Sequence, residues 1–255
     1  GSVFVSESDA GKCLRMLVSV LYRVALRHNE AVFFQNPEDA DLFRARSILP
    51  PSTPVVVLNG SGVNLDRYEF APPSHSPVSF LLMARLIWEK GIGEFVEAAR
   101  TIRRRHSKVA CRVAGPFDEN PSAVPRAEVE EWVREGAIDY LGELDDVRPA
   151  IRQASVCVLP SRYREGVPRT LLEGMAMGRP IIATDVPGCR ETVVNGVNGY
   201  LVPPENREAL AEAMNYFVDR PEAIERMGRE SRRIAEDRFC VGEVNRRILS
   251  SMSLA

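Results

Sequence analysis

Apolar residues along the chain recur with two different periods, which predict alternating β-strands and α-helices. Short apolar runs of strand length occupy residues 31–35, 55–58, 78–84, 109–114, 138–141, 155–159, 180–184 and 199–202. Apolar residues three or four positions apart predict helices over 12–28, 36–48, 91–106, 122–135 and 146–153, from 169, near 189–194, and over 205–219, 221–236 and 241–252. Apolar strands that alternate with amphipathic helices form βαβ units. The pattern therefore predicts an α/β fold in which helices cover both faces of a parallel sheet.

One stretch interrupts this alternation and predicts a linker. Residues 60–77, GSGVNLDRYEFAPPSHSP, are rich in Gly, Pro and Ser, which favour turns and loops over regular elements. Before the linker, Asn36 and Pro37 favour a helix start, because Asn caps the first turn and Pro has no amide to leave unpaired there. The chain begins with Gly-Ser and not with methionine, which indicates a processed chain or a fragment.

Composition and charge exclude several classes of protein. Apolar residues make up 45% and charged residues 27% of the chain, and 33 basic against 35 acidic residues leave a formal net charge of −2. No overall basic field therefore attracts nucleic acid, and no apolar run reaches the ~18 residues of a membrane span. The five widely spaced cysteines and three distant histidines (His28, His75 and His106) predict a reduced, cytoplasmic protein without a metal site.

The loops that follow the strands are the places to search for a binding site, because parallel sheets bind ligands at the carboxyl ends of their strands. In the loop at 160–169, Glu165 and Gly166 precede a helix that carries Glu173. Free amides at the start of that helix predict an anion site, and the two carboxylates can accept hydrogen bonds from hydroxyl groups. This set suits a ligand with both phosphate and sugar. The alternative is a solvated helix start that acidic residues stabilise.

A second loop, after the strand at 78–84, carries two cations. Arg85 follows that strand, and Lys90 precedes Gly91, where the next helix opens. We expect both to reach the same edge of the sheet as Glu165, where Arg offers a planar fork and Lys a point charge to phosphate oxygens. The alternative is a pair of solvated surface cations. The chain contains neither a GxGxxG fingerprint nor a GxxxxGK[ST] loop, which argues against dinucleotide binding and against a P-loop NTPase.

Four segments in this order resemble the donor-binding half of retaining glycosyltransferases with the GT-B fold, and within them the family-4 group that builds lipid-linked bacterial polysaccharides. They are ARLIWEKGIGEF, YLGEL, LPSRYREGVPRTLLEGMAMGRPIIATDVPGCRETV and NGVNGYLVPP. Earlier segments, AVFFQNPEDADLF and VLNGSGVNL, resemble the end of the first domain and the crossover of that group. The resemblance implies a remnant of an N-terminal acceptor domain at 1–60 and an interdomain linker at 61–77. It further implies a Rossmann-like donor-binding domain at 78–240 and, within 241–255, a helix that crosses back to the first domain.

The resemblance also implies roles for individual residues. Arg85 and Lys90 match the pair that grips the donor diphosphate. Glu173 matches the acceptor of the ribose hydroxyls, and Glu165 matches the carboxylate at the donor sugar. The remaining implied contacts are the amides of Gly166, Val167, Arg169 and Thr170, for phosphate and sugar, and the backbone of Leu144, for the base, usually uracil.

The resemblance implies that catalysis rests on Arg85, Lys90 and Glu165, without a metal or another cofactor. The two cations stabilise the departing diphosphate, and Glu165 positions the sugar rather than attacking it. The chain departs from many relatives at Val167-Pro168, where they have Phe-Gly. Proline has no amide, so the amide contacts at this point differ from theirs.

The implied function is transfer of a hexosyl or N-acetylhexosaminyl group from a UDP-sugar, with retention, to a glycan or polyprenyl-diphosphate-linked acceptor. This chain would supply donor binding and be inactive alone, since acceptor recognition belongs to the first domain. Two alternatives are open. One is a nucleotide-sugar-binding subunit of a split glycosyltransferase, and the other is a sugar-nucleotide epimerase related to the GT-B enzymes.

The helix predicted at 12–28 bears on partners and location. Its apolar face consists of Leu14, Leu17, Val18, Leu21, Val24 and Ala25, and the opposite face carries Lys12, Arg15, Ser19, Arg23 and Arg27. Such a helix can lie on an anionic membrane, which predicts a cytoplasmic protein peripheral to the inner face of the membrane. The alternative is that the apolar face packs on the rest of the first domain. Left uncovered, that face predicts self-association.

Overall fold

The computed structural model describes residues 9–74 and 76–252, so the predictions for residues 1–8, His75 and 253–255 lie outside the described residues. The N-terminal segment comprises α1 (Asp9–Ala25), a 3₁₀ turn (Leu26–His28), β1 (Val32–Phe34), α2 (Pro37–Ala45) and β2 (Val55–Val57). β1 and β2 pair in parallel. Asn36 caps α2 as predicted, because its Oδ1 accepts a hydrogen bond from the Asp39 amide at 2.8 Å.

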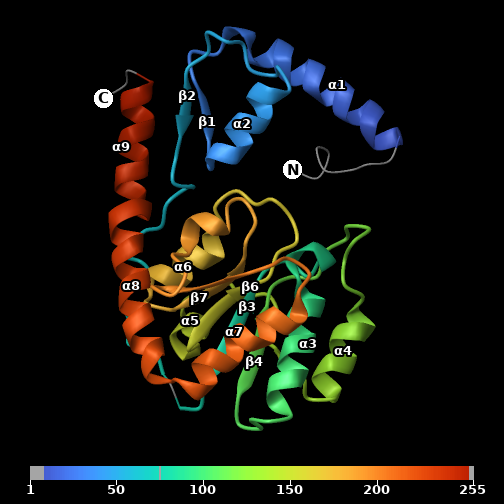
Figure 1. Ribbon diagram of the computed structural model, residues 1–255, viewed down its shortest axis with the longest axis vertical. Coiled ribbons are helices and arrows are strands. Elements are labelled where there is room, and N and C mark those ends of the chain that lie inside the picture. Colours follow the sequence, from blue (N-terminus) through green and yellow to red (C-terminus); the bar gives the residue numbers. More distant parts are fainter. Residues whose placement is uncertain (1–8, 75, 253–255) are drawn as a thin grey trace.

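A six-stranded parallel sheet forms the centre of the larger part of the molecule (Figure 1). Its strands are β3 (Ser79–Met83), β4 (Ala110–Ala114), β5 (Asp139–Tyr140), β6 (Val156–Leu159), β7 (Ile181–Thr184) and β8 (Gly199–Val202). They lie in the order β5-β4-β3-β6-β7-β8, and every neighbouring pair is parallel. All residues of β3, β6 and β7 are buried, which explains why these segments form almost unbroken apolar runs.

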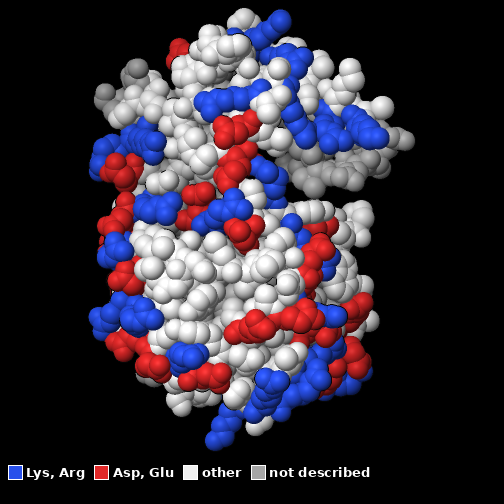
Figure 2. Space-filling view, viewed as in Figure 1, with Lys and Arg blue, Asp and Glu red and all other residues white. Residues whose placement is uncertain are grey.

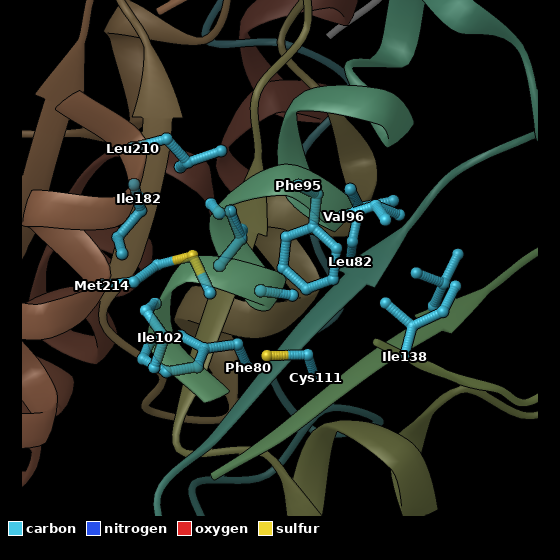
Figure 3. Packing of buried hydrophobic residues seen from close by; sticks show 14 of the residues in the cluster. Phe80, Leu82, Phe95, Val96, Ile102, Cys111, Ile138, Ile182, Leu210 and Met214 are labelled. Carbon is cyan, nitrogen blue, oxygen red and sulfur yellow. The ribbon is translucent and has the colours of Figure 1, made fainter. Parts of the chain in front are cut away.

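Helices cover both faces of this sheet, which confirms the predicted fold class. They are α3 (Ile92–Arg103), α4 (Arg126–Arg134), α5 (Arg148–Gln153), α6 (Arg169–Ala176), α7 (Arg207–Asp219) and α8 (Glu222–Phe239), with short 3₁₀ turns at Trp88–Lys90 and Arg190–Thr192. Alternate residues of β3 face opposite cores: Phe80 and Leu82 join α3, α4 and α7, whereas Leu81 and Met83 join α5 and α6. Figure 3 shows the first core, in which Phe80 and Leu82 lie near Phe95 of α3.

Several elements are shorter than the sequence pattern predicts, and the helix predicted near 189–194 is only the 3₁₀ turn at Arg190–Thr192. α4 begins at Arg126 rather than near residue 122. Pro125 disfavours the helical conformation at Val124, and the backbone of 122–124 pairs instead with Leu86 and Trp88 in the loop after β3. β5 keeps only Asp139 and Tyr140 of the predicted 138–141, since it is the edge strand and pairs with β4 alone.

The direction in which the chain builds the sheet changes between β3 and β6. From β3 the sheet grows outward through β4 to β5, and the chain then returns to place β6 on the other side of β3. The loops after β3 and β6 therefore lead away from each other at the same edge of the sheet. A crevice opens between such loops, and it is the usual ligand site of open α/β sheets.

The predicted linker is tied to the C-terminal helices. The Val63 amide donates to the Phe239 carbonyl at 2.8 Å, and the Val241 amide donates to the Val63 carbonyl at 3.1 Å. α9 (Val241–Ser251) starts at this point and runs from the level of the sheet toward the level of β1 and β2 (Figure 1). The domain boundaries at 61, 78 and 241 stay predictions.

The apolar face of α1 is largely exposed. Its exposed large apolar residues are Leu14, Met16, Leu17, Val20, Leu21, Tyr22 and Val24. Figure 2 shows basic side chains gathered over the same helix. Within residues 9–74 and 76–252, no helix has both the length and the apolar character that crossing a membrane requires.

Glycine at position 91 allows the loop after β3 to lie close to the backbone that follows β6. Gly91 has a φ of 73°, and a Cβ there would lie 2.0 Å from the carbonyl oxygen of Pro160, just after β6. Gly136 is a matched control, because its φ is 72° but nothing lies within 4 Å of its Cβ position.

We expect Gly136→Ala to lower the free energy of unfolding by about 1–2 kcal/mol through backbone strain alone. Gly91→Ala should lower it by more than about 3 kcal/mol, because the backbone at Pro160 must also move. Urea unfolding of both variants measures the difference. Equal losses would show that the close approach at Pro160 does not constrain the fold.

Candidate functional site

Lys90 and Glu165 meet across the crevice, although 75 positions separate them in the sequence. Lys90 Nζ lies 2.6 Å from Glu165 Oε1, and Ser161 Oγ donates to the same oxygen at 2.7 Å. The Lys90 and Glu165 side chains are only 20% and 16% exposed, so water and salt screen their attraction less than that of a surface pair. The structure therefore brings together a cation after β3 and a carboxylate after β6.

A cleft of about 540 Å³ opens beside this ion pair. It is lined by Arg85, Ile87, Glu89, Lys90, Asn120, Pro121, Ser122, Tyr163, Arg164 and Glu165. The Arg85 side chain is 58% exposed, and its Nη1 donates to Asp118 Oδ2 at 2.7 Å. The lining combines three cations and two carboxylates with hydroxyl and amide groups. Such a mixture suits a ligand that carries both negative charge and hydroxyls.

The N-terminus of α6 adds backbone donors at the end of the loop after β6. Pro168 precedes the helix and has no amide. The amides of Arg169 and Thr170 open the helix, where no helical carbonyl one turn earlier can accept from them, and the helix dipole adds positive character. The Val167 amide is already engaged, because it donates to Gln35 Oε1 at 2.9 Å. A ligand reaches the Val167 amide only if Gln35 releases it.

Glu173 lies in the second turn of α6, and its largely buried carboxylate is held from two sides. Tyr68 OH donates to Oε1 at 2.9 Å, and the Arg169 guanidinium lies 3.7 Å from the same oxygen. Burial raises the pKa of Glu173, while the Tyr68 hydrogen bond and the charges of Arg169 and Arg67 act in the opposite direction. Burial, together with the Glu173 charge, raises the pKa of Tyr68 to about 12, so the phenol keeps its proton.

The site residues expected from the sequence fall into two groups. Arg85, Lys90 and Glu165 line the cleft, whereas Glu173 and Leu144 lie outside its lining. Leu144, in the loop after β5, is half-buried against the core beneath α5 and α6. The roles assigned to these residues stay predictions.

The N-terminal segment holds the loop that carries Glu165. Asn36 Nδ2 donates to the Glu165 carbonyl at 3.2 Å, and Asp39 pairs with Arg164 at 2.9 Å. A Cβ on Gly166 would lie 2.2 Å from the side-chain oxygen of Gln35, so a larger residue there would displace the Gln35 amide. The junction between β1 and α2 therefore fixes the backbone of the loop after β6.

Sequence reasoning missed the residues that hold the site groups in place. They are Gln35 and Asn36 at the loop, Tyr68 at Glu173, Asp118 at Arg85 and Ser161 at Glu165. Gln35, Asn36, Asp118 and Ser161 all follow strands, so a search of every such loop could have found them. Tyr68 lies in the predicted linker, and no signal in the sequence connects it with Glu173.

Metal ligands do not gather anywhere in the part of the chain that the structure describes, where no group of three or more His, Cys, Asp or Glu could hold an ion. All five cysteines are free, and Cys111, Cys157 and Cys189 are buried.

Residues 77–220 match the family described as Glycosyl transferases group 1. Over 232 residues the chain is 26% identical to the N,N'-diacetylbacillosaminyl-diphospho-undecaprenol alpha-1,3-N-acetylgalactosaminyltransferase of Campylobacter jejuni, a match that covers 86% of this chain and 59% of that protein. Over 186 residues it is 28% identical to a glycogen synthase of Mycobacterium tuberculosis, covering 71% of this chain and 44% of that protein. The chain thus spans less than two thirds of the length of each of these relatives.

Solved structures share the fold. A crystal structure of Anabaena HepE in complex with UDP matches with a TM-score of 0.77 at 20% identity, covering 93% of this chain and 68% of that one. A glycosyltransferase from Rickettsia africae matches with a TM-score of 0.78 at 22% identity, covering 91% and 65%. These likenesses confirm the expected GT-B type of fold. Because the family match extends over more than half of its length, the chain belongs to the group 1 glycosyl transferases.

Proposed function

We propose that this chain binds the nucleotide-diphosphate sugar donor of a glycosyltransferase, with a UDP-sugar as donor and a glycan or polyprenyl-diphosphate-linked acceptor. The Lys90–Glu165 ion pair beside the cleft carries the proposal, because it sets a cation for phosphate next to a carboxylate for sugar hydroxyls. UDP and UDP-glucose in HepE crystal structures support the donor class. The diphospho-undecaprenol in the name of the Campylobacter jejuni relative supports the acceptor class.

Lys90 and Arg85 bind the diphosphate in this proposal. Both line the cleft, and Arg85 can exchange Asp118 for phosphate oxygens in a similar charged hydrogen bond. The N-terminus of α6 adds the amides of Arg169 and Thr170, which favour an anion in the same way. These fixed groups provide the positive charge that the leaving group needs, so the proposal includes no metal or other cofactor.

Glu173 and Leu144 bind the nucleoside. Tyr68 occupies Oε1 of Glu173, which leaves Oε2 as the acceptor for a ribose hydroxyl. The backbone of Leu144, after β5, meets the base, and its half-buried position against the core keeps that backbone in place.

Sugar transfer follows from the charges that develop in the reaction. Breaking the anomeric bond leaves positive charge on the sugar ring and negative charge on the departing nucleoside diphosphate. Arg85 and Lys90 stabilise that leaving group, and such preorganised partners each change the rate by about 10²–10³. Glu165 orients the sugar rather than attacking it, because Lys90 and Ser161 already hold its Oε1. The acceptor attacks the anomeric carbon from the same face from which the leaving group departs. This retains the anomeric configuration.

The transferred sugar in this proposal is a hexosyl or N-acetylhexosaminyl group. Transfer takes place at the cytoplasmic side of a membrane, and α1 contacts that membrane peripherally. The exposed apolar residues of α1 and the basic side chains over it support such contact. Self-association through the same face is the competing use of α1, and sedimentation at several concentrations separates the two.

Substitution of the two carboxylates should separate their ligands. Glu173→Ala removes the charged acceptor of the ribose hydroxyls and should weaken UDP binding by roughly 1.5–3 kcal/mol. Glu165→Ala should spare UDP and weaken only UDP-glucose and other UDP-sugars. Calorimetry with UDP and a panel of UDP-sugars measures both effects, with the exposed Glu212→Ala on α7 as control. Equal losses for both ligands in both variants would refute the assignment.

Removing the Lys90 charge should weaken every ligand that carries the diphosphate. We expect Lys90→Ala to bind UDP about tenfold or more weakly, since the phosphate loses a charge-assisted hydrogen bond and faces an unpaired Glu165. The exposed Lys108→Ala has the same change in net charge and should bind UDP like the wild type. Titration with UDP and uridine checks the cause, because uridine lacks phosphate and its affinity should not change. A Lys90 variant with unaltered UDP affinity would exclude Lys90 from the site.

If the buried Glu173 carboxylate serves ligand binding, it should lower the free energy of unfolding. Because burial raises its pKa in the folded state, the ionised carboxylate disfavours folding, and this penalty is complete above the folded-state pKa. The penalty vanishes below the ordinary pKa of 4.5, where both states are protonated. Glu173→Gln should therefore raise the urea midpoint at about pH 7.5 and lose that advantage near about pH 4. A midpoint at about pH 7.5 that is no higher than the wild-type value would contradict this expectation.

A further inference from the structure

Tyr68 stands outside the motifs that predict the site, yet its hydroxyl binds a site carboxylate directly. It lies 105 positions before Glu173 in the chain, and the hydrogen bond between them is buried. The Tyr68 side chain belongs to the core beneath α5 and α6, and only 7% of the residue is exposed. The hydroxyl therefore contacts Glu173 from the core of the protein and not from the solvent side.

The backbone of Tyr68 is fixed relative to the helix that carries Glu173. The Tyr68 amide donates to the Asn64 carbonyl at 3.0 Å. Arg232 of α8 donates through Nη1 to the Tyr68 carbonyl at 2.9 Å and to the Ala176 carbonyl, at the end of α6, at 2.8 Å. One guanidinium thus ties the linker to α6, and this sets the position of the phenol against Glu173.

The pairing of the Glu173 carboxylate with a neutral hydroxyl does not favour the stability of the fold. A buried carboxylate without a close cation costs free energy that an apolar pair of similar shape would avoid. Arg169 lies 3.7 Å away, but its side chain is 72% exposed, so solvent weakens its compensation. Tyr68 uses only Oε1, which leaves a charged oxygen, Oε2, in a fixed orientation.

We propose that Tyr68 is a positioning residue that orients the Glu173 carboxylate so that Oε2 meets a ribose hydroxyl, and thereby sets the preference for nucleotides that carry the ribose hydroxyls over nucleotides that lack them. The inference rests on the nucleotide binding proposed above. It adds a residue of the linker to the determinants of nucleotide specificity.

The same hydrogen bond opposes the rise in the pKa of Glu173 that burial causes. The groups that face Glu173 are Tyr68 and Arg67 from the linker, Arg169 from α6, and Cys157 from β6. Burial raises the pKa of Cys157 to about 12, so this thiol stays neutral. Without the Tyr68 hydroxyl, only the two arginines oppose burial, and the pKa of Glu173 rises further.

Tyr68→Phe tests the proposal, because it removes one oxygen and keeps the ring that packs in the core. The affinities of the chain for UDP and for 2′,3′-dideoxy-UDP are measured by calorimetry from about pH 5.5 to 8.5. Their ratio isolates the ribose hydroxyls and cancels the titration of the terminal phosphate, which both ligands share. We expect the variant to lower this ratio about 3- to 10-fold at about pH 7.5. As the pH falls, the variant should lose its remaining preference for UDP over dideoxy-UDP at a higher pH than the wild type, because its Glu173 has the higher pKa.

Tyr216→Phe is the control, since Tyr216 packs against Tyr200 in a separate aromatic cluster and its substitution should leave the ratio unchanged. An unchanged ratio in Tyr68→Phe would overturn the inference alone. Equal losses of affinity for UDP and dideoxy-UDP would also overturn it, because they would indicate a general structural role. If the wild-type chain failed to bind UDP at all, the proposed function itself would fall, and this inference with it.

Discussion

The adjacency of β3 and β6 at the centre of the sheet determines where the functional groups lie. The two strands pair in parallel, with Phe80 opposite Val156, so their carboxyl ends lie at the same edge. Neighbouring strands are only ~4.8 Å apart, which is close enough for side chains of the two following loops to touch. If β6 paired with β5 instead, two further strand spacings would separate Lys90 from Glu165. The ion pair, the cleft beside it and the need for glycine at 91 all follow from this one pairing.

The candidate site is held together by internal partners. The main pairs are Lys90 with Glu165, Arg85 with Asp118, Tyr68 with Glu173, and Gln35 with the Val167 amide. A ligand that contacts any of these groups therefore replaces a hydrogen bond or shares one. The net contribution of each contact is the difference between two interactions of about 1–3 kcal/mol each, so orientation matters more than the number of contacts. Groups that keep their partner while they bind, such as Glu173 with one oxygen engaged, lose least in the exchange.

Local patterns in the sequence predicted nearly every helix and strand, because apolar periodicity reports directly which face of an element is buried. They also found the cleft residues Arg85, Lys90 and Glu165, since loops after parallel strands share one edge of the sheet. The order of the strands was beyond such patterns, because it depends on contacts between distant segments. Tyr68 was missed for the same reason: in a stretch rich in Gly, Pro and Ser it gives no sign that its hydroxyl points into the core. The shorter α4 reflects Pro125 and pairing with the loop after β3, and the shorter β5 reflects its edge position, none of which periodicity reports.

The contacts between the β1–α2 junction and the loop after β6 link the position of that loop to the N-terminal segment. Asn36 and Gln35 hold backbone atoms of the loop itself, at the Glu165 carbonyl and the Val167 amide. A hydrogen bond loses most of its strength once its heavy atoms separate beyond ~3.5 Å, so only a small swing of the segment is compatible with both contacts. A larger swing would break the bond to Gln35, and the Val167 amide would then be available beside those that open α6. Two hydrogen bonds between side chains of the N-terminal segment and main-chain atoms of the loop thereby couple the orientation of that segment to the amides available at the start of α6.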